Sequence, residues 1–167
     1  MDKEAFGRMV IRNEQQIYRI AKSILQNDDD CADAAQEAIA RALTALPTLK
    51  NDAYAKTWFI RILIHAAFDI SKKQNYQGWV YDEDLLDRPY ERQDYSDLYD
   101  AILSLPEDYR AVVVMHYIEG YHIREISEIM DLSEGAVKTR LRRGRQALKR
   151  FLEEDSPPRR GIKVIGL

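Results

Sequence analysis

One cysteine, seven glycines and five prolines are all that the 167 residues contain of these three types. The single thiol, Cys31, cannot form a disulfide within the chain, which is typical of a protein in a reducing compartment. The most apolar stretch, residues 58–68, is interrupted by Arg61 and His65 and is far shorter than the ~20 residues that cross a bilayer. Nothing in the sequence resembles a signal peptide. We therefore expect a cytoplasmic protein that does not insert into a membrane.

The sequence also lacks the features of an enzyme. Its three histidines, His65, His116 and His122, have no cysteine or acid at the spacing of a metal site. There is no glycine-rich phosphate loop and no nucleophile motif. We expect no enzymatic activity, no metal and no cofactor.

The hydrophobic pattern predicts an all-α protein of two small domains. Hydrophobic residues make up 46% of the chain and recur with helical spacing, and alternating β-branched strands are absent. Residues 76–97 lack that spacing, contain Gly78 and Pro89, and are rich in acids. We therefore expect helical domains at 1–75 and 98–153, an acidic flexible linker at 76–97, and a tail at 154–167 outside the folded body.

Positive charge is concentrated on residues 137–150, which hold seven Lys or Arg and no acid in a chain of net charge −3. On a helical wheel Val137, Leu141, Gly144 and Leu148 form a core stripe. Thr139, Arg142, Arg143 and Gln146 point away from that stripe, and Lys138, Arg140 and Arg145 flank it. Solvated helix faces usually mix charges of both signs, so this pattern favours a polyanion as partner over a merely solvated face.

The residues before this helix predict a helix-turn-helix. Residues 122–130 form a short amphipathic helix, followed by a turn through Asp131 and Ser133. Asp131 stands where a left-handed residue must end the first helix, and Ser133 is placed to cap the second. In this arrangement the second helix enters a major groove, although an ordinary αα-hairpin has a similar pattern.

In the first domain, residues 30–46 predict a helix with a polar face. Ala35, Ile39, Ala42, Leu43 and Leu46 make its buried stripe. Asp33 and Glu37 lie opposite this stripe, with Gln36 at the edge. The face can receive a basic partner helix, and a solvated surface is the alternative.

Four motifs, DAAQEAIARAL, KTWFIRILIHAAFDISKK, LPEDYRAVVVMHYIEGYHIREISEIM and SEGAVKTRLRRGRQALK, occur in this order. With them the chain resembles the extracytoplasmic-function sigma factors from about Ala5 to Leu152. The resemblance implies an alternative sigma factor that binds core RNA polymerase, recognises −35 and −10 promoter elements and starts transcription of a stress or envelope-response regulon. Its implied partners are the clamp helices and flap of core polymerase, promoter DNA, and an anti-sigma factor, which can hold it at the membrane.

The resemblance also assigns roles to residues. For core binding it implies Asp33, Gln36 and Glu37. For the −35 element it implies Lys138, Thr139, Arg140, Arg142, Arg143, Arg145 and Gln146. For the −10 element the candidates are Lys50, Asn51, Lys56, Thr57, His65, Lys72 and Lys73. His65 stands where many members of the family have asparagine.

The polar loop at residues 47–57 lies between two expected helices, where it can hold a base that leaves the stack. Trp58, next to this loop, is a candidate stacking platform for such a base. Its helical spacing with Ile62, however, favours packing in the core.

Two other classes of protein remain as alternatives. A helix-turn-helix regulator that acts without polymerase needs a dimer interface and paired half-sites, and the second domain shows no surplus apolar helix for one. A membrane-surface or interaction module exposes its large apolar residues. Here the apolar stripe of residues 137–152 is needed for the protein's own core.

Overall fold

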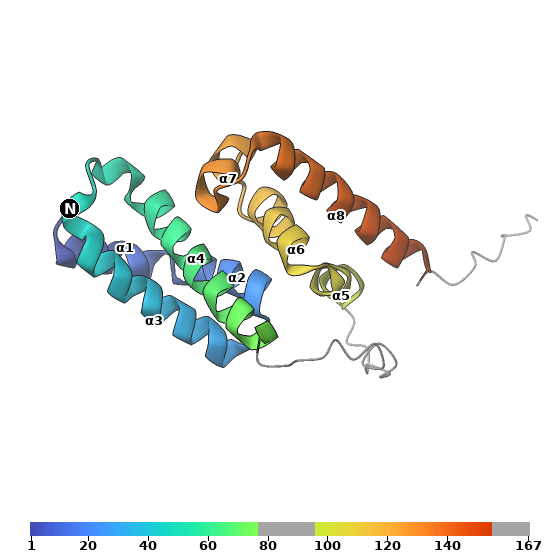
Figure 1. The fold of residues 1–167 in the computed structure, drawn as a ribbon, viewed down its shortest axis with the longest axis horizontal. Helices are drawn as coiled ribbons and strands as arrows, with labels where there is room; N and C mark the ends of the chain where they lie inside the picture. The colour runs from blue at the N-terminus through green and yellow to red at the C-terminus, as the bar shows by residue number, and fades with distance from the viewer. Residues whose placement is uncertain (77–95, 155–167) are drawn as a thin grey trace, which may run out of the picture.

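The computed structural model describes residues 1–76 and 96–154, and every regular element in these ranges is helical. The first domain comprises α1 (Lys3–Arg12), α2 (Glu14–Leu25), α3 (Asp28–Ala45), the short turns η1 (Leu46–Thr48) and η2 (Asp52–Tyr54), and α4 (Ala55–Tyr76). The second comprises α5 (Ser96–Ser104), α6 (Glu107–Val113), the π-helical turn η4 (Val114–Ile118), α7 (Ile123–Met130) and α8 (Glu134–Glu154). The expected all-α fold with two helical domains is confirmed (Figure 1).

The expected linker and tail lie largely outside the described residues. In the described ranges, no helix combines the length and the apolar character needed to cross a membrane.

The first domain packs α2, α3 and α4 against one another (Figure 1). On α3 the fully buried residues are Ala34, Ala38 and Ala42, one turn apart, and such small side chains let α4 approach closely. Ala35 and Ile39, expected in the buried stripe, are only half-buried, so the stripe is centred about one residue earlier than predicted. Burial also raises the pKa of the Cys31 thiol on α3 to about 11, which keeps it neutral.

The helix-turn-helix of α7 and α8 forms as predicted, and local contacts define its ends. The Glu125 carboxylate accepts from the backbone N–H of His122 at 2.8 Å, at the start of α7. Asp131 ends α7 in the left-handed region with a φ of 53°. The Ser133 hydroxyl accepts from the backbone N–H of Ala136 at 3.0 Å and so caps α8.

The core of the second domain joins this pair of helices to α6. Ile126 and Ile129 of α7 are buried with Val137 and Leu141 of α8, as expected from the sequence. Further along α8, Gly144 is buried against α6: a Cβ built there would lie 2.8 Å from Cγ2 of Val113. The absence of a side chain at Gly144 therefore fixes how closely α8 approaches α6.

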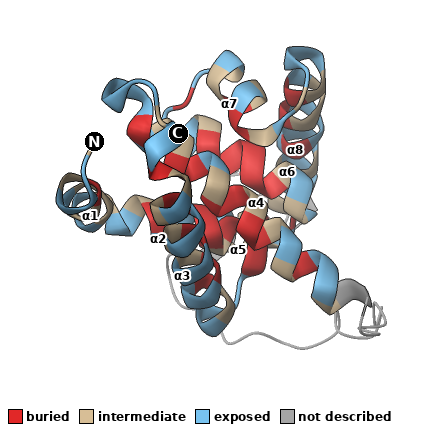
Figure 2. Ribbon diagram, turned by 60° about the vertical axis from the view of Figure 1, so that its left-hand side comes forward, coloured by how far each residue is buried: buried red, intermediate tan, exposed pale blue. Residues whose placement is uncertain are grey.

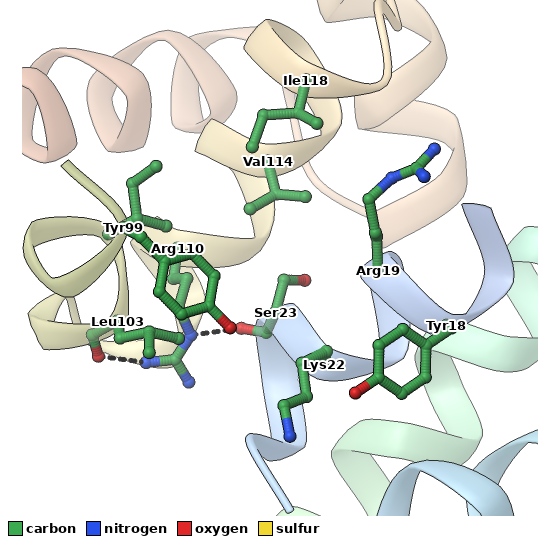
Figure 3. A pocket seen from close by; sticks show the side chains of 10 residues that line it. Tyr18, Arg19, Lys22, Ser23, Tyr99, Leu103, Arg110, Val114 and Ile118 are labelled. Carbon is green, nitrogen blue, oxygen red and sulfur yellow. Dashed lines mark hydrogen bonds between the residues drawn. The ribbon is translucent and has the colours of Figure 1, made fainter. Parts of the chain in front are cut away.

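The two domains pack against each other through α2, which contacts α6 and η4, and through α4, which contacts α7. Figure 2 shows the buried residues gathered where the helices face one another. At this seam an apolar cavity of about 250 Å³ is bordered by Tyr18 of α2, Tyr99 of α5 and Ile118 of η4 (Figure 3). The two domains therefore form one closed arrangement.

A buried guanidinium bridges the seam. Arg110 of α6 is only 5% exposed, and it donates to the carbonyl of Ser23 near the end of α2 (Figure 3). It donates as well to the carbonyl of Ile24 in the same turn. It also donates to the carbonyls of Leu103 and Leu105 in its own domain, at 3.0 and 2.8 Å. A cation at the carboxyl end of a helix is further stabilised by the helix dipole.

Glu119 makes a second connection across the seam. Its side chain, 3% exposed, accepts from Arg19 of α2 at 2.6 and 3.1 Å and from the amide of Gln16 at 3.0 Å. The hydrogen bond to Glu119 raises the pKa of Arg19. Through Arg110 and Glu119, the second domain therefore binds the first domain at α2.

The close approach at Gly144 predicts that Gly144→Ala destabilises the protein. Overpacking a core costs about 1–3 kcal/mol, and the better helix propensity of alanine returns only about 1 kcal/mol. Gly7→Ala on α1 is the control, because a Cβ there meets nothing within 4 Å. We expect urea unfolding to show a net loss of up to about 2 kcal/mol for Gly144→Ala and no loss for Gly7→Ala. Equal stability of both variants would contradict the close packing of α8 on α6.

The bridge at Arg110 predicts that Arg110→Met weakens the whole molecule. The variant leaves buried carbonyls on both domains without this donor, at a cost of about 2–3 kcal/mol. Arg8→Met is the control, since Arg8 is exposed and, among the described residues, its ion-pair partner is Glu4 on the same helix, at 3.7 Å. We expect the urea midpoint to fall for Arg110→Met and to stay within error for Arg8→Met. Equal midpoints would show that the seam does not depend on this guanidinium.

Candidate nucleic-acid interface

The outer face of α8 presents a row of cations. Lys138, Arg142, Arg143, Arg145 and Gln146 are exposed, and Thr139 and Arg140 are partly buried. The stripe of Val137, Leu141 and Gly144 faces the opposite way, into the core. The helical wheel predicts these positions well: Arg140 flanks the stripe as expected, and Thr139, expected to point away from the core, lies closer to the protein than predicted.

Three of the arginines on α8 are oriented by neighbouring side chains. Arg143 donates to the hydroxyl of Tyr109 at 3.3 Å and Arg145 to that of Tyr117 at 2.8 Å. Arg140, with a side chain 25% exposed, lies 3.6 Å from the Asp108 carboxylate. A phenol leaves the charge of a guanidinium intact, whereas a carboxylate offsets it.

Two cations on the same face have no such partner. Lys138 and Arg142 make no ion pair with another residue in the described ranges. The row therefore keeps most of its positive charge for an external anion. Arginine at this position in a helix-turn-helix can donate two hydrogen bonds to a guanine edge or grip a phosphate.

The candidate −10 residues fall into separate groups. Lys50 and Asn51 lie in the loop before α4, where the Asn51 side chain accepts from the backbone N–H of Ala53 and caps η2. Lys56 and Thr57 were expected in this loop but belong to the first turn of α4. The loop is thus shorter than predicted, because η2 leads directly into the helix.

The other −10 candidates lie along α4. His65 stands in the middle of the helix, and Lys72 and Lys73 are exposed near its carboxyl end. Lys56 and Lys72 are separated by about 24 Å along the helix axis, at 1.5 Å per residue. The structure therefore does not bring these residues into one cluster, and a ligand that touches all of them must be extended.

Trp58 contributes more to packing than to an open surface. Its ring is partly buried and meets Phe6 of α1 edge-on at 6.5 Å between centroids. Phe6 also packs edge-on against Phe59 at 5.5 Å. This arrangement agrees with the core-packing interpretation of Trp58.

The polar face of α3 is open to solvent. Asp33, Gln36 and Glu37 are all exposed on it. Glu37 pairs with Arg41 one turn later at 2.7 Å, and Arg41 also reaches Asp69 of α4 at 3.0 Å. Hydrogen bonds to these two carboxylates raise the pKa of Arg41. The acids of this face can receive a basic partner helix, with Arg41 as their local counter-ion.

Two polar groups escaped the sequence analysis. Asp131 was expected only to end α7, yet its carboxylate lies against Arg61 and His65 of α4. Arg110 was not singled out, although it joins the domains. For the contact of Asp131 with α4 the sequence held one signal. Arg61 interrupts an apolar stretch four residues before His65, which places two polar groups on one face of α4.

Comparison with known proteins identifies both halves of the chain. The family model for sigma-70 region 2 matches residues 9–76, and that for sigma-70 region 4 matches residues 95–148. The RNA polymerase sigma factor SigV of Bacillus subtilis is 32% identical over 140 residues, covering 82% of this chain and 84% of its own length. The chain belongs to the extracytoplasmic-function sigma factors. It is an alternative sigma factor that recognises promoters and initiates transcription.

Other known proteins match this sigma factor along most of its length. SigW of Bacillus subtilis is 30% identical over 171 residues, covering 92% of this chain and 91% of its own. RpoE of Bartonella quintana, solved with the anti-sigma factor NepR, has a TM-score of 0.72 at 20% identity and covers 92% of this chain and 99% of its own. CnrH, solved with the cytosolic domain of CnrY, has a TM-score of 0.67 at 22% identity, covering 93% and 92%.

Proposed function

We propose that the two domains of this sigma factor divide promoter recognition between them. The first domain, residues 1–75, binds core polymerase through α3 and engages the −10 element. The second, residues 98–153, reads the −35 element through α8. The observation that carries the proposal is the row of cations on the outer face of α8, within a helix-turn-helix.

The charge of the whole chain supports this division. With a net charge of −3, most of the protein is not attracted to a polyanion. The row on α8 is the exception, because no acid lies between Lys138 and Arg150. Attraction to DNA is thereby strongest at the helix that enters the groove.

The first domain has the complementary property. Asp33 and Glu37 make the exposed face of α3 acidic, as a receptor for basic helices of the polymerase clamp requires. Lys50, Lys56, Lys72 and Lys73 lie on other parts of this domain, where they can follow an extended DNA strand. The match of residues 9–76 to sigma-70 region 2 favours this role over that of a regulator acting without polymerase.

An anti-sigma factor is the further partner we propose. Among the aligned structures, the sigma factor RpoE is bound to the anti-sigma factor NepR, and CnrH is bound to the cytosolic domain of CnrY. A partner of this kind would act on this chain in the cytoplasm, where core polymerase and promoter DNA are found. The flap of the polymerase is the proposed second contact, made by the second domain.

The role of α3 predicts that Glu37→Lys weakens binding to core polymerase about tenfold, which is about 1.4 kcal/mol. The fold should persist, because Glu37 is exposed and its ion pair in the part of the chain that the structure describes is with Arg41 of the same helix. Glu4→Lys is the matched control: it reverses an exposed charge that pairs with Arg8 at the same helical spacing on α1. Competition with a labelled sigma factor for core enzyme measures both variants. If they compete equally well, α3 does not make the contact.

The role of α8 predicts different effects for two of its arginines. Arg143→Ala should cost about 1–3 kcal/mol at one −35 position and relax the preference there. Arg140→Ala should weaken all sequences alike and lower the salt slope by about one unit. Arg124→Ala is the control, since Arg124 is an exposed cation on α7 that pairs with Glu128.

Holoenzyme binding to a panel of −35 variants, repeated over a salt series, measures these effects. A uniform loss across the panel for both Arg143→Ala and Arg140→Ala would show that α8 grips DNA without reading it.

A further inference from the structure

The turn of the helix-turn-helix rests on α4 of the first domain. The Asp131 carboxylate lies 2.5 Å from Nη2 of Arg61 through one oxygen and 3.1 Å from Nε2 of His65 through the other. These contacts join residues about 70 positions apart in the chain. The turn of a DNA-reading motif is thus held by the helix that carries the candidate −10 residues.

The geometry of Asp131 is set by the backbone. Asp131 is in the left-handed region, with a φ of 53° and a ψ of 44°, and its N–H donates to the Ser127 carbonyl. On α4, Arg61 and His65 are one turn apart and share a face. Arg61 donates to one oxygen of Asp131 and Nε2 of His65 lies beside the other, so the two residues form a fork around the carboxylate, with side chains 47% and 43% exposed. A carboxylate with both oxygens engaged resembles a phosphodiester in the same fork.

The fork belongs to a longer basic stripe on α4. Arg61, His65, Phe68 and Lys72 follow at helical spacing and so lie along one face. His65, Phe68 and Lys72 line a cleft of about 420 Å³ between α4 and the helix-turn-helix. Its lining is part polar and part apolar, and Arg140 of α8 and the carboxylates of Asp69 and Asp108 also border it. A DNA backbone laid along this stripe would need the space that the turn occupies.

Both promoter elements cannot be engaged in this arrangement. Elements at −10 and −35 are about 25 base pairs apart, or about 85 Å at 3.4 Å per base pair. In the closed structure the two domains touch through hydrogen bonds. The domains must therefore separate before both elements are bound, and the contact at Asp131 is lost when they do.

We propose that Arg61 and His65 form a phosphate-binding site for promoter DNA on α4, and that the Asp131 carboxylate is its internal competitor. Asp131 occupies the site while the domains are closed and frees it when they open. This inference rests on the proposed function, because it takes α4 as a DNA-facing helix. It adds Arg61 to the DNA surface and gives Asp131 a role that is separate from the fold of the turn.

The first test is a double-mutant cycle on the full chain without polymerase. The probe is a fluorescein-labelled single-stranded DNA of about 20 nucleotides, long enough to cover one domain. Asp131→Asn removes the charge and keeps a residue that tolerates the left-handed backbone. We expect binding to tighten about two- to fivefold, the range that one half-exposed ion pair supports. In an Arg61→Gln background the same change should give no gain.

The matched control is Glu128→Gln. It removes the same charge from α7, where the carboxylate is exposed and pairs with Arg124 of the same helix at 3.3 Å. We expect little change in binding from this variant. If Glu128→Gln tightens binding as much as Asp131→Asn, or if the gain persists in the Arg61→Gln background, charge alone explains the effect and the proposal is overturned.

The second test measures the separation of the domains without DNA. Spin labels at Thr44→Cys on α3 and Lys149→Cys on α8, both exposed positions, report the distance in a Cys31→Ala background. We expect Asp131→Asn to enlarge the population with long distances, and Glu128→Gln to leave it unchanged. An unchanged distribution for Asp131→Asn would overturn the competitor role.

Transcription by the holoenzyme separates this proposal from the proposed function. Once polymerase holds the domains apart, Asp131 is away from α4, so Asp131→Asn should transcribe at the wild-type level. A change as large as that seen with free DNA would place the effect of Asp131 within the helix-turn-helix and overturn the proposal. Failure of the wild-type chain to support any promoter-dependent transcription would instead refute the proposed function.

Discussion

The buried guanidinium of Arg110 is the interaction on which the arrangement of both domains depends. Burying a cation is costly unless its donors are satisfied, and here carbonyls from both domains accept from it. Two of those carbonyls lie in the last turn of α2. Arg110 therefore fixes the second domain at the carboxyl end of that helix. Once this seam is fixed, the turn at Asp131 falls on α4 and the outer face of α8 points to solvent.

The local parts of this structure could be predicted from the sequence, because local signals determine them. The cap at Ser133, the left-handed Asp131 and the core stripe through Val137 and Leu141 each involve residues a few positions apart, and all were foreseen. The buried stripe of α3 was predicted to within one residue of its true centre. The small error arises because alanines and larger apolar residues share this stripe, and a helical wheel does not show which of them are most deeply buried.

The contacts between the domains could not be predicted in this way. Arg110, Glu119 and Asp131 are charged residues, and in a sequence a charged residue on a helix suggests a solvated face. Their partners lie about 70 to 100 residues away. Helical periodicity carries no information about such pairs, so the closed arrangement and the fork of Arg61 and His65 emerged only from the structure.

The two DNA-facing helices differ in how their charge is balanced. On α8, Arg143 and Arg145 donate to the phenols of Tyr109 and Tyr117, and Lys138 and Arg142 have no ion partner in the described ranges, so their field extends into solvent. Arg140 is the cation of this row that a carboxylate, Asp108, offsets. The basic stripe of α4 is instead offset by a carboxylate from the other domain. A distant polyanion is therefore attracted first to α8. On the proposed function, Arg61 and His65 become available to DNA only after α7 and α8 have moved away, so the opening of the domains adds this site to the DNA-binding surface of the first domain.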